Sequence, residues 1–219
     1  MRQGAEIGAQ TRLFSVPTVL SYSDGHLVTS KVADLVPLRE ALHRAALEEG
    51  VALVETVGRC LAAIHDRLSA GKEGPTIGWK GTFVAPDVVV VHGDFGMTNV
   101  QVRRSDSRIV ILDWAAPAWA SGLGSRASSH WDLSLFLVDM NYQRPGDPRY
   151  IRRTHDLSQA FVRAYWTERS MHPAIQGWQR HLTRMTANYY RHAGTGLARL
   201  ARLPSSSLFL ARAPLLKTT

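Results

Sequence analysis

The run VVVVHGDFGMTNVQVRRSDSRIVILDW, residues 88–114, is the part of this 219-residue chain that decides its fold. Four valines predict a buried strand that leads into His92 and Asp94, and Asn99 follows shortly after. A Ser-Asp-Ser turn signal then separates two further apolar segments, the second of which ends at Asp113. Because a hairpin brings its strand ends side by side, we expect Asp94, Asn99 and Asp113 at one edge of a small sheet.

The residue types at this edge indicate a particular chemistry. Two carboxylates and a carboxamide supply hard oxygen ligands of the kind that Mg²⁺ prefers. A carboxylate that the metal does not use can orient a hydroxyl group and accept its proton. These are the components of phosphoryl transfer, where catalysis is mostly positioning and charge neutralisation. A transition-metal hydrolase built on His92, Asp94 and Asp113 is the alternative, although Asn99 suits Mg²⁺ better.

The motifs resemble those of the aminoglycoside phosphotransferase and choline kinase-like family, a branch of the protein-kinase-like fold. The HGDxxxxN pattern of residues 92–99 is similar to the catalytic loop of that family, and ILDW at 111–114 is similar to its metal-binding strand end. WDLS at 131–134 resembles a later helix start whose Asp supports the loop, and LAAIH at 61–65 resembles the preceding helix. The resemblance covers roughly residues 16–139.

The resemblance implies a role for each matching residue. Asp94 is implied as the catalytic base, and Asn99 and Asp113 as the ligands of Mg²⁺. His92 and Asp132 are implied as structural residues that hold the loop through hydrogen bonds. The implied activity is transfer of the γ-phosphate of ATP, or of another nucleoside triphosphate, to a hydroxyl group of a small molecule.

The nucleotide is also expected to meet a hinge-like segment. The backbone of Ser30, Lys31 and Val32 is expected to lie against its adenine edge. A full family member carries a β-rich lobe before the hinge, with a phosphate-covering loop and a strand lysine. Residues 1–32 leave no room for that lobe, and no lysine precedes Lys31. The expectation is therefore a truncated or split kinase, with a catalytically impaired pseudokinase or partner-docking module as the alternative.

The wider pattern predicts an α+β fold that is protein-kinase-like: mostly the helical C-lobe, with a catalytic β-hairpin and a reduced N-terminal β element. Residues 1–32 are expected to form a remnant of the N-lobe and the hinge. Residues 33–219 are expected to form the C-lobe, with a frayed tail over residues 203–219. In the N-terminal remnant, β-rich segments at 16–22 and 27–32 flank a hairpin turn signal.

Helical periodicity covers about residues 37–68, and Gly50 is expected to divide this stretch into two helices. On this stretch, His65 is expected to be a satisfied packing residue and not a ligand. Helical patterning resumes after the catalytic run, and Asp139 lies two helical turns after Asp132. We expect Asp139 at the helix surface or in a capping position.

The amino-acid composition argues against disulfide-bonded, cysteine-rich metal-binding and membrane-spanning proteins. The chain is 45% hydrophobic and 20% charged, which provides ample apolar material for a core. The single Cys60 excludes an internal disulfide and a multi-cysteine metal site. No apolar run approaches the roughly 20 residues that cross a bilayer, and the N-terminus lacks the pattern of a secretory signal. We therefore expect no membrane span and a cytoplasmic protein.

The net charge of +8 is unevenly distributed. Residues 1–140 contain 13 Lys and Arg and 15 Asp and Glu, whereas residues 141–219 contain 13 and 3. A basic C-terminal third disfavours a polycationic aminoglycoside and favours a neutral or anionic acceptor. Nucleic-acid binding is a minor alternative, which would require an affinity that falls steeply with salt. A second chain that supplies an N-lobe is a further expected partner.

Overall fold

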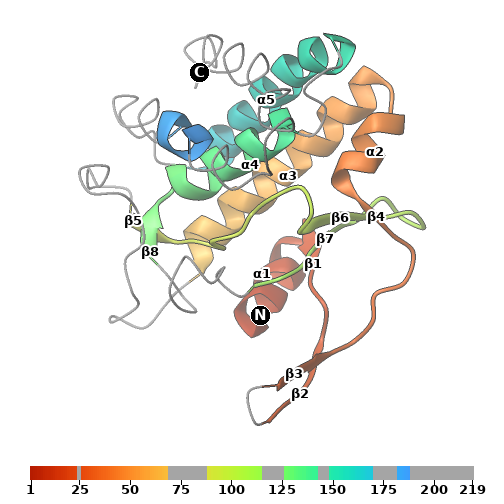
Figure 1. Cartoon of the computed structure of the whole chain (residues 1–219). Coiled ribbons are helices and arrows are strands. Elements are labelled where there is room, and N and C mark those ends of the chain that lie inside the picture. Colours follow the sequence, from red (N-terminus) through yellow and green to blue (C-terminus); the bar gives the residue numbers. More distant parts are fainter. Residues whose placement is uncertain (24–25, 69–87, 115–125, 143–147, 170–181, 188–219) are drawn as a thin grey trace.

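The structure is a computed structural model that describes residues 1–23, 26–68, 88–114, 126–142, 148–169 and 182–187. Its helices and strands are, in chain order, α1 (Arg2–Thr11), β1 (Phe14–Ser15), β2 (Val19–Ser23), β3 (His26–Thr29), β4 (Leu35–Pro37), α2 (Leu38–Arg44), α3 (Leu47–Arg67), β5 (Val88–Val90), β6 (Val100–Arg103), β7 (Ile109–Ile111), β8 (Arg126–Ser128), α4 (His130–Tyr142) and α5 (Pro148–Glu168). Helices α3, α4 and α5 lie together above the strands, as Figure 1 shows.

The central sheet has the strand order β1-β7-β6-β4. Strands β6 and β7 form the antiparallel hairpin that the sequence predicts, with Val100 opposite Ile111. The turn is closed by the Arg103 N–H, which donates to the Arg108 carbonyl at 2.9 Å. Strand β1 pairs in parallel with β7, whereas β5 and β8 form a separate antiparallel pair. The two segments that flank the HGDxxxxN pattern therefore belong to different sheets.

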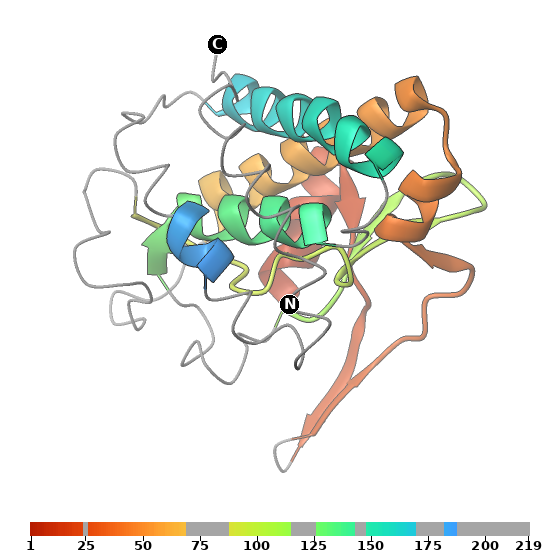
Figure 2. The ribbon, with the colours of Figure 1, turned by 45° about the horizontal axis from the view of Figure 1, so that its top comes forward.

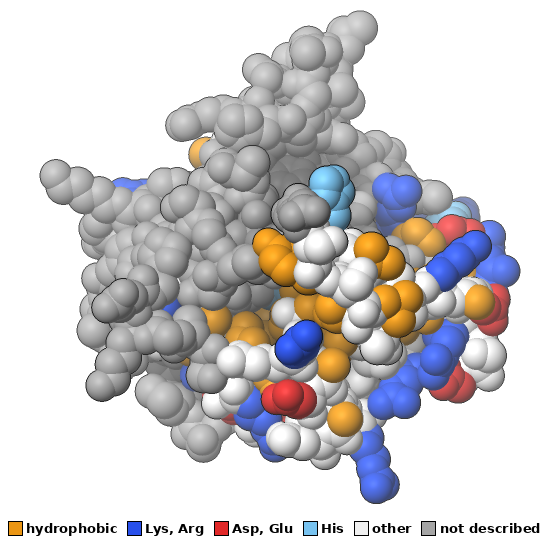
Figure 3. Space-filling model, turned by 90° about the horizontal axis from the view of Figure 1, so that it is seen from below, with side chains coloured by type: hydrophobic (Ala, Val, Ile, Leu, Met, Phe, Trp, Pro, Cys, Tyr) orange, Lys and Arg blue, Asp and Glu red, His pale blue; other side chains and the backbone are white. Residues whose placement is uncertain are grey.

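The expected N-terminal hairpin is present as a two-stranded ribbon of β2 and β3, called the N-terminal ribbon below, which projects from the molecule (Figure 2). Its first strand begins at Val19, later than predicted, and the preceding residues Phe14–Ser15 pair with β7. Both strands expose large apolar side chains, namely Leu20, Tyr22, Leu27 and Val28. Seen from below, the molecule shows apolar side chains among polar ones, and most of the visible Lys and Arg side chains lie along the right side (Figure 3). The reduced N-terminal β element is thus a largely exposed ribbon.

The predicted helical stretch over residues 37–68 forms two helices, but the break does not lie at Gly50, so that prediction is wrong. The chain is extended at Ala45 and Ala46, whose ψ angles are 152° and 168°. The Ala46 N–H donates to Glu49 Oε2 at 3.0 Å, which starts α3 before the glycine is reached. Gly50 is buried inside α3, where it lies against α5.

The core forms between α3, α4, α5 and the central sheet. Helices α3 and α5 approach closely at Gly58, where a Cβ atom would stand 2.6 Å from the Phe161 carbonyl oxygen. Helix α4 is buried on every side over residues 130–141, which is typical of a central helix. Within the described ranges, no helix combines the length and the apolar character that a bilayer span requires.

The observed architecture confirms the predicted α+β class, with a mostly helical body, a hairpin at its centre and few strands. The boundary after residue 32 stays a prediction. The expected fraying of residues 203–219 lies outside the described residues.

Candidate active site

The loop between β5 and β6, residues 91–99, carries the HGDxxxxN pattern and is fastened to α4. At its start Gly93 has a φ of 90°, a conformation that side chains disfavour, so the backbone requires glycine here. The Gly93 N–H donates to Asp132 Oδ1 at 3.0 Å. The Gly93 carbonyl accepts a hydrogen bond from Trp131 Nε1 at 3.1 Å. The first turn of α4 therefore holds both backbone groups of this glycine.

Asp132 is a fully buried carboxylate that accepts hydrogen bonds from three donors. Besides the Gly93 N–H, these are the His92 N–H at 2.8 Å and His65 Nε2 at 3.0 Å. A carboxylate taken out of water requires such donors. The contacts agree with the loop-holding role that the resemblance implies for Asp132.

His92 joins the 91–99 loop to the strand end that carries Asp113. Its Nε2–H donates to the Leu112 carbonyl at 3.0 Å, and its Nδ1 accepts the Asp94 N–H at 3.4 Å. This arrangement requires a neutral ring, and burial lowers the pKa of His92. The ring also packs 5.0 Å from that of Trp114. Both nitrogens of His92 are therefore engaged within the protein, which argues against a metal ligand at this position.

Asp94 is half-buried, and the side chain of Asn99 holds it in place. Asn99 Nδ2 donates to the Asp94 carbonyl and to Asp94 Oδ2, both at 2.9 Å. Burial raises the pKa of the Asp94 carboxyl above 3.8, the hydrogen bond from Asn99 and the nearby His92 oppose the rise, and the charge of Asp113 adds to it. Because Oδ2 is engaged, Oδ1 is the oxygen that can meet a hydroxyl group.

Asn99 lies opposite Leu112, the residue before Asp113, across the hairpin. The Leu112 N–H donates to the Asn99 carbonyl at 2.8 Å, which extends the pairing of β6 and β7 to the residue before Asp113. Asp113 is exposed and has a φ of 48°, so the backbone turns sharply at the strand end. With Nδ2 of Asn99 committed to Asp94, the Asn99 Oδ1 and the Asp113 carboxylate are two hard oxygen donors, and this set suits Mg²⁺.

The described residues contain no group of three or more His, Cys, Asp or Glu side chains that could hold a metal ion. A transition-metal site of that kind therefore has no support within those ranges. Mg²⁺ binding differs, because the ion uses one or two protein ligands and completes its shell with water and phosphate. Asn99 and Asp113 fit this mode.

His65 is buried, as expected of a packing residue, yet it is also connected to the loop. Tyr165 Oη donates to His65 Nδ1 at 2.7 Å, and His65 Nε2 donates to Asp132. Arg169 extends this hydrogen-bond network. Its Nη1 donates to Tyr165 Oη at 2.8 Å, and its Nε donates to Asp66 Oδ1 at 2.9 Å. The sequence pattern did not reveal this connection, because His65 and Tyr165 lie 100 residues apart.

Asp139 is a further residue of α4 that contacts the loop. It is buried, so the expected helix-surface position is wrong. Asp139 Oδ2 accepts the Met97 N–H at 2.7 Å. A spacing of seven residues from Asp132 puts both carboxylates on one side of α4, and this spacing was the signal that could have revealed the contact.

The hinge-like segment follows the N-terminal ribbon. The Ser30 N–H donates to the Thr18 carbonyl at 2.8 Å, and Ser30 Oγ accepts the Thr18 N–H at 2.9 Å. The Ser30 amide is thus engaged at the base of the ribbon. Lys31 is exposed and Val32 is half-buried. The contact of this segment with adenine stays a prediction, and it applies to the backbone of Lys31 and Val32.

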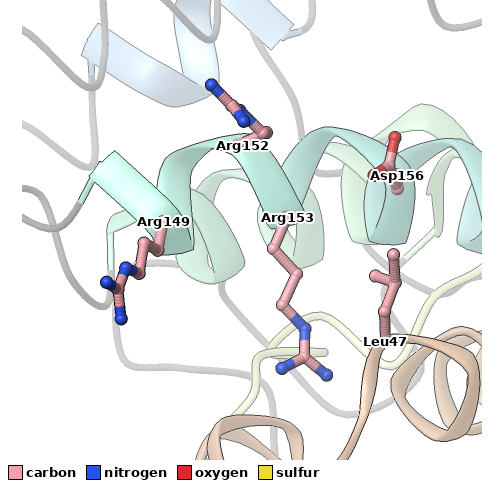
Figure 4. A pocket seen from close by; sticks show the side chains of 5 residues that line it. All are labelled: Leu47, Arg149, Arg152, Arg153 and Asp156. Carbon is pink, nitrogen blue, oxygen red and sulfur yellow. The ribbon is translucent and has the colours of Figure 1, made fainter.

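A separate pocket of about 350 Å³ lies where α5 begins, and it is lined by Leu47, Arg149, Arg152, Arg153 and Asp156. Figure 4 shows that Arg149 and Arg153 extend to one side of α5, whereas Arg152 extends to the other. Arg153 Nη2 donates to the Ala46 carbonyl at 2.8 Å. Because the guanidinium groups diverge, the pocket adds positive charge to this surface without forming a convergent site.

No protein-family model matches this sequence, and no curated protein does so. Among solved structures, glucosamine kinase in crystal form B matches with a TM-score of 0.62 and 14% identity, over 98% of this chain and 69% of that one. Glucosamine kinase in complex with glucosamine, ADP and inorganic phosphate matches with a TM-score of 0.62 and 15% identity, over 98% and 72%. An aminoglycoside-3'-phosphotransferase of type VIII matches with a TM-score of 0.47 and 18% identity, over 94% and 77%. The fold prediction is confirmed: this chain has the protein-kinase-like fold.

Proposed function

We propose that this chain is a phosphotransferase that moves the γ-phosphate of ATP, or of another nucleoside triphosphate, to a hydroxyl group of a small molecule. The observation that carries the proposal is the half-buried Asp94 carboxylate. Asn99 donates a hydrogen bond to it, and the charge of Asp113 contributes to its raised pKa. A base and two oxygen ligands thus occur together on one hairpin and its loop. The similar glucosamine kinase complex, which contains ADP and phosphate, supports a nucleotide as the donor.

In the proposed reaction, Asp94 Oδ1 orients the acceptor hydroxyl and takes its proton. The hydroxyl oxygen forms a bond to the γ-phosphorus, while the bond between that phosphorus and the departing nucleoside diphosphate breaks. A raised pKa makes the Asp94 carboxylate a stronger base than an exposed aspartate. Asn99 keeps the carboxylate in one orientation, and His92 keeps the loop attached to the strand end that carries Asp113.

Asn99 Oδ1 and the Asp113 carboxylate are the groups that would hold Mg²⁺. When bound, the ion neutralises charge on the phosphates. The backbone of Lys31 and Val32 is the part of the hinge-like segment proposed to meet the adenine edge.

The acceptor is proposed to be neutral or anionic. Residues 141–219 contain 13 Lys and Arg and 3 Asp and Glu, and an excess of positive charge repels a polycation. The three arginines around the pocket at the start of α5 belong to this basic third. An acceptor screen should therefore begin with neutral and anionic alcohols.

A thermal-shift experiment tests the proposed nucleotide site. ATP with Mg²⁺ at about 100 times its dissociation constant adds about 2.7 kcal/mol to the free energy of unfolding, which raises Tm by roughly 5–10 °C for a chain of this size. We expect this rise in the unaltered chain and its loss in Asp113→Asn or when Mg²⁺ is omitted. A rise that persists in Asp113→Asn would contradict the assignment of Asp113.

Asp94→Asn is expected to stabilise the metal-free protein at neutral pH. Burial raises the folded-state pKa of Asp94, so its ionisation costs stability, and this cost is fully present above the folded pKa. The cost declines as the pH falls through the folded pKa and vanishes below the unfolded value. Thermal unfolding in EDTA between about pH 4 and pH 8 should therefore show a gain in Tm that grows with pH. A gain of constant size would contradict this account.

A non-catalytic docking module is the second candidate function. The N-terminal ribbon favours it, because Tyr22 is 71% exposed and Leu20 is 63% exposed. The outer edges of a two-stranded apolar ribbon of this kind can accept further strands from a partner. The partner that this candidate requires is a second polypeptide that adds a β-lobe to the ribbon. A docking module would show no Mg²⁺-dependent shift with ATP, so the thermal-shift experiment separates the two candidates.

A further inference from the structure

One peptide unit of the 91–99 loop, between Gly96 and Met97, is held from both sides. Its N–H belongs to Met97 and donates to Asp139 Oδ2 at 2.7 Å. Its carbonyl belongs to Gly96 and accepts the N–H groups of Asn99 and Val100, both at 3.1 Å. A carboxylate that accepts a peptide N–H polarises that peptide and strengthens the hydrogen bonds of its carbonyl. Asp139 therefore reinforces the turn that carries Asn99.

The surroundings of Asp139 leave little freedom for another arrangement. Its exposed fraction is 4%, and it belongs to a helix that is buried over residues 130–141. A Cβ atom at Gly96 would stand 3.1 Å from Asp139 Oδ2, so the loop backbone lies directly on the carboxylate. The ring of Phe95 packs 5.7 Å from that of Phe136, one helical turn before Asp139. This side of α4 thus serves as the support of the loop.

Helix α4 anchors the loop at two points. Asp132 accepts the backbone N–H groups at the beginning of the loop, and Asp139 accepts that of Met97. The two carboxylates are seven residues apart, which corresponds to about 10 Å along the helix axis. Asp94 lies between the anchors, and Asn99 lies just after the second one. Asp132 therefore fixes the part of the loop next to Asp94. Asp139 fixes the part next to Asn99, whose side-chain amide orients the Asp94 carboxylate.

We propose that Asp139 is a positioning residue that sets the affinity of the site for a divalent cation by fixing Asn99 relative to Asp113. The identity of the cation as Mg²⁺ rests on the proposed function. Without the anchor at Met97, the turn before Asn99 loosens, and the two oxygen donors no longer keep a constant separation. Donors that must be ordered at the moment of binding bind more weakly than donors that are already in place.

The test compares Asp139→Ala and Asp139→Asn with a matched control, Asn141→Ala. Asn141 is buried on the same helix, but its Nδ2 donates to the Leu137 carbonyl of α4 itself, at 2.7 Å. In the metal-free chain, well below its unfolding temperature, hydrogen exchange of the Met97 amide should become at least about tenfold faster in Asp139→Ala. It should stay near the unaltered rate in Asp139→Asn, whose amide oxygen can still accept, and in Asn141→Ala.

The second readout is a titration with Mg²⁺ in the presence of ADP. The Mg²⁺ concentration at half-saturation should rise about tenfold in Asp139→Ala and little in the other two variants. Equal loop exchange in Asp139→Ala and Asn141→Ala would overturn the anchoring. Faster exchange with an unchanged half-saturation would overturn the effect on the cation. An unaltered chain that binds no Mg²⁺ with ADP would contradict the proposed function itself, and the exchange comparison would still decide whether Asp139 anchors the loop.

Discussion

Asp94→Ala is expected to lower kcat by about 10²–10⁴, which is the usual contribution of a general base. The variant removes the carboxylate that takes the hydroxyl proton and leaves the proposed Mg²⁺ ligands in place. The KM for the nucleotide should therefore change much less than kcat. The measurement is steady-state kinetics with an acceptor chosen from a screen of neutral and anionic alcohols.

Asp156→Ala is the matched control for this experiment. Asp156 is an exposed carboxylate on α5, outside the 91–99 loop and the hairpin, so the control removes the same charge without touching the site. It should retain the activity of the unaltered chain. Activity that survives in Asp94→Ala would refute the role of Asp94 as the base, and a loss of equal size in both variants would indicate a general effect of charge.

Asp132→Ala is expected to cost about 3–5 kcal/mol of the free energy of unfolding and to abolish activity. The substitution leaves three buried donors without their acceptor: the backbone N–H groups of His92 and Gly93, and His65 Nε2. A loss of this size is a large part of the 5–15 kcal/mol that is typical of a folded domain. Tm should fall by roughly 6–20 °C.

Ser134→Ala provides the control for Asp132→Ala. Ser134 lies two residues further along α4, and its buried hydroxyl has no hydrogen-bond partner among the described residues. Removing that hydroxyl should leave Tm unchanged or raise it slightly, because no bond is lost. If Asp132→Ala and Ser134→Ala lowered Tm by similar amounts, the three hydrogen bonds would not be the cause.

Short-range pattern was sufficient to predict the hairpin and the helices around it. Four valines, a Ser-Asp-Ser turn and two apolar segments specify strands and a reversal within a few residues of chain. The break predicted at Gly50 was wrong, because the start of α3 is set by the Glu49 carboxylate and by the extended conformation of Ala46. The low helix propensity of glycine predicted a break at this position. Gly50 instead lies inside α3, where the close packing of α5 leaves little room for a side chain.

The sequence by itself determined which residues share the hairpin and its loop. Strand pairing brings Asn99 opposite Leu112, the residue before Asp113, and the short 91–99 loop keeps Asp94 within hydrogen-bond reach of Asn99. Only the tertiary structure decided how the loop is held. Asp139 meets Met97 across 42 residues, and Tyr165 meets His65 across 100. Such contacts arise when α4 and α5 pack against the loop and α3, and periodicity within one segment carries no information about them. Burial, which raises the pKa of Asp94 and leaves Asp132 dependent on three donors, is likewise a product of that packing.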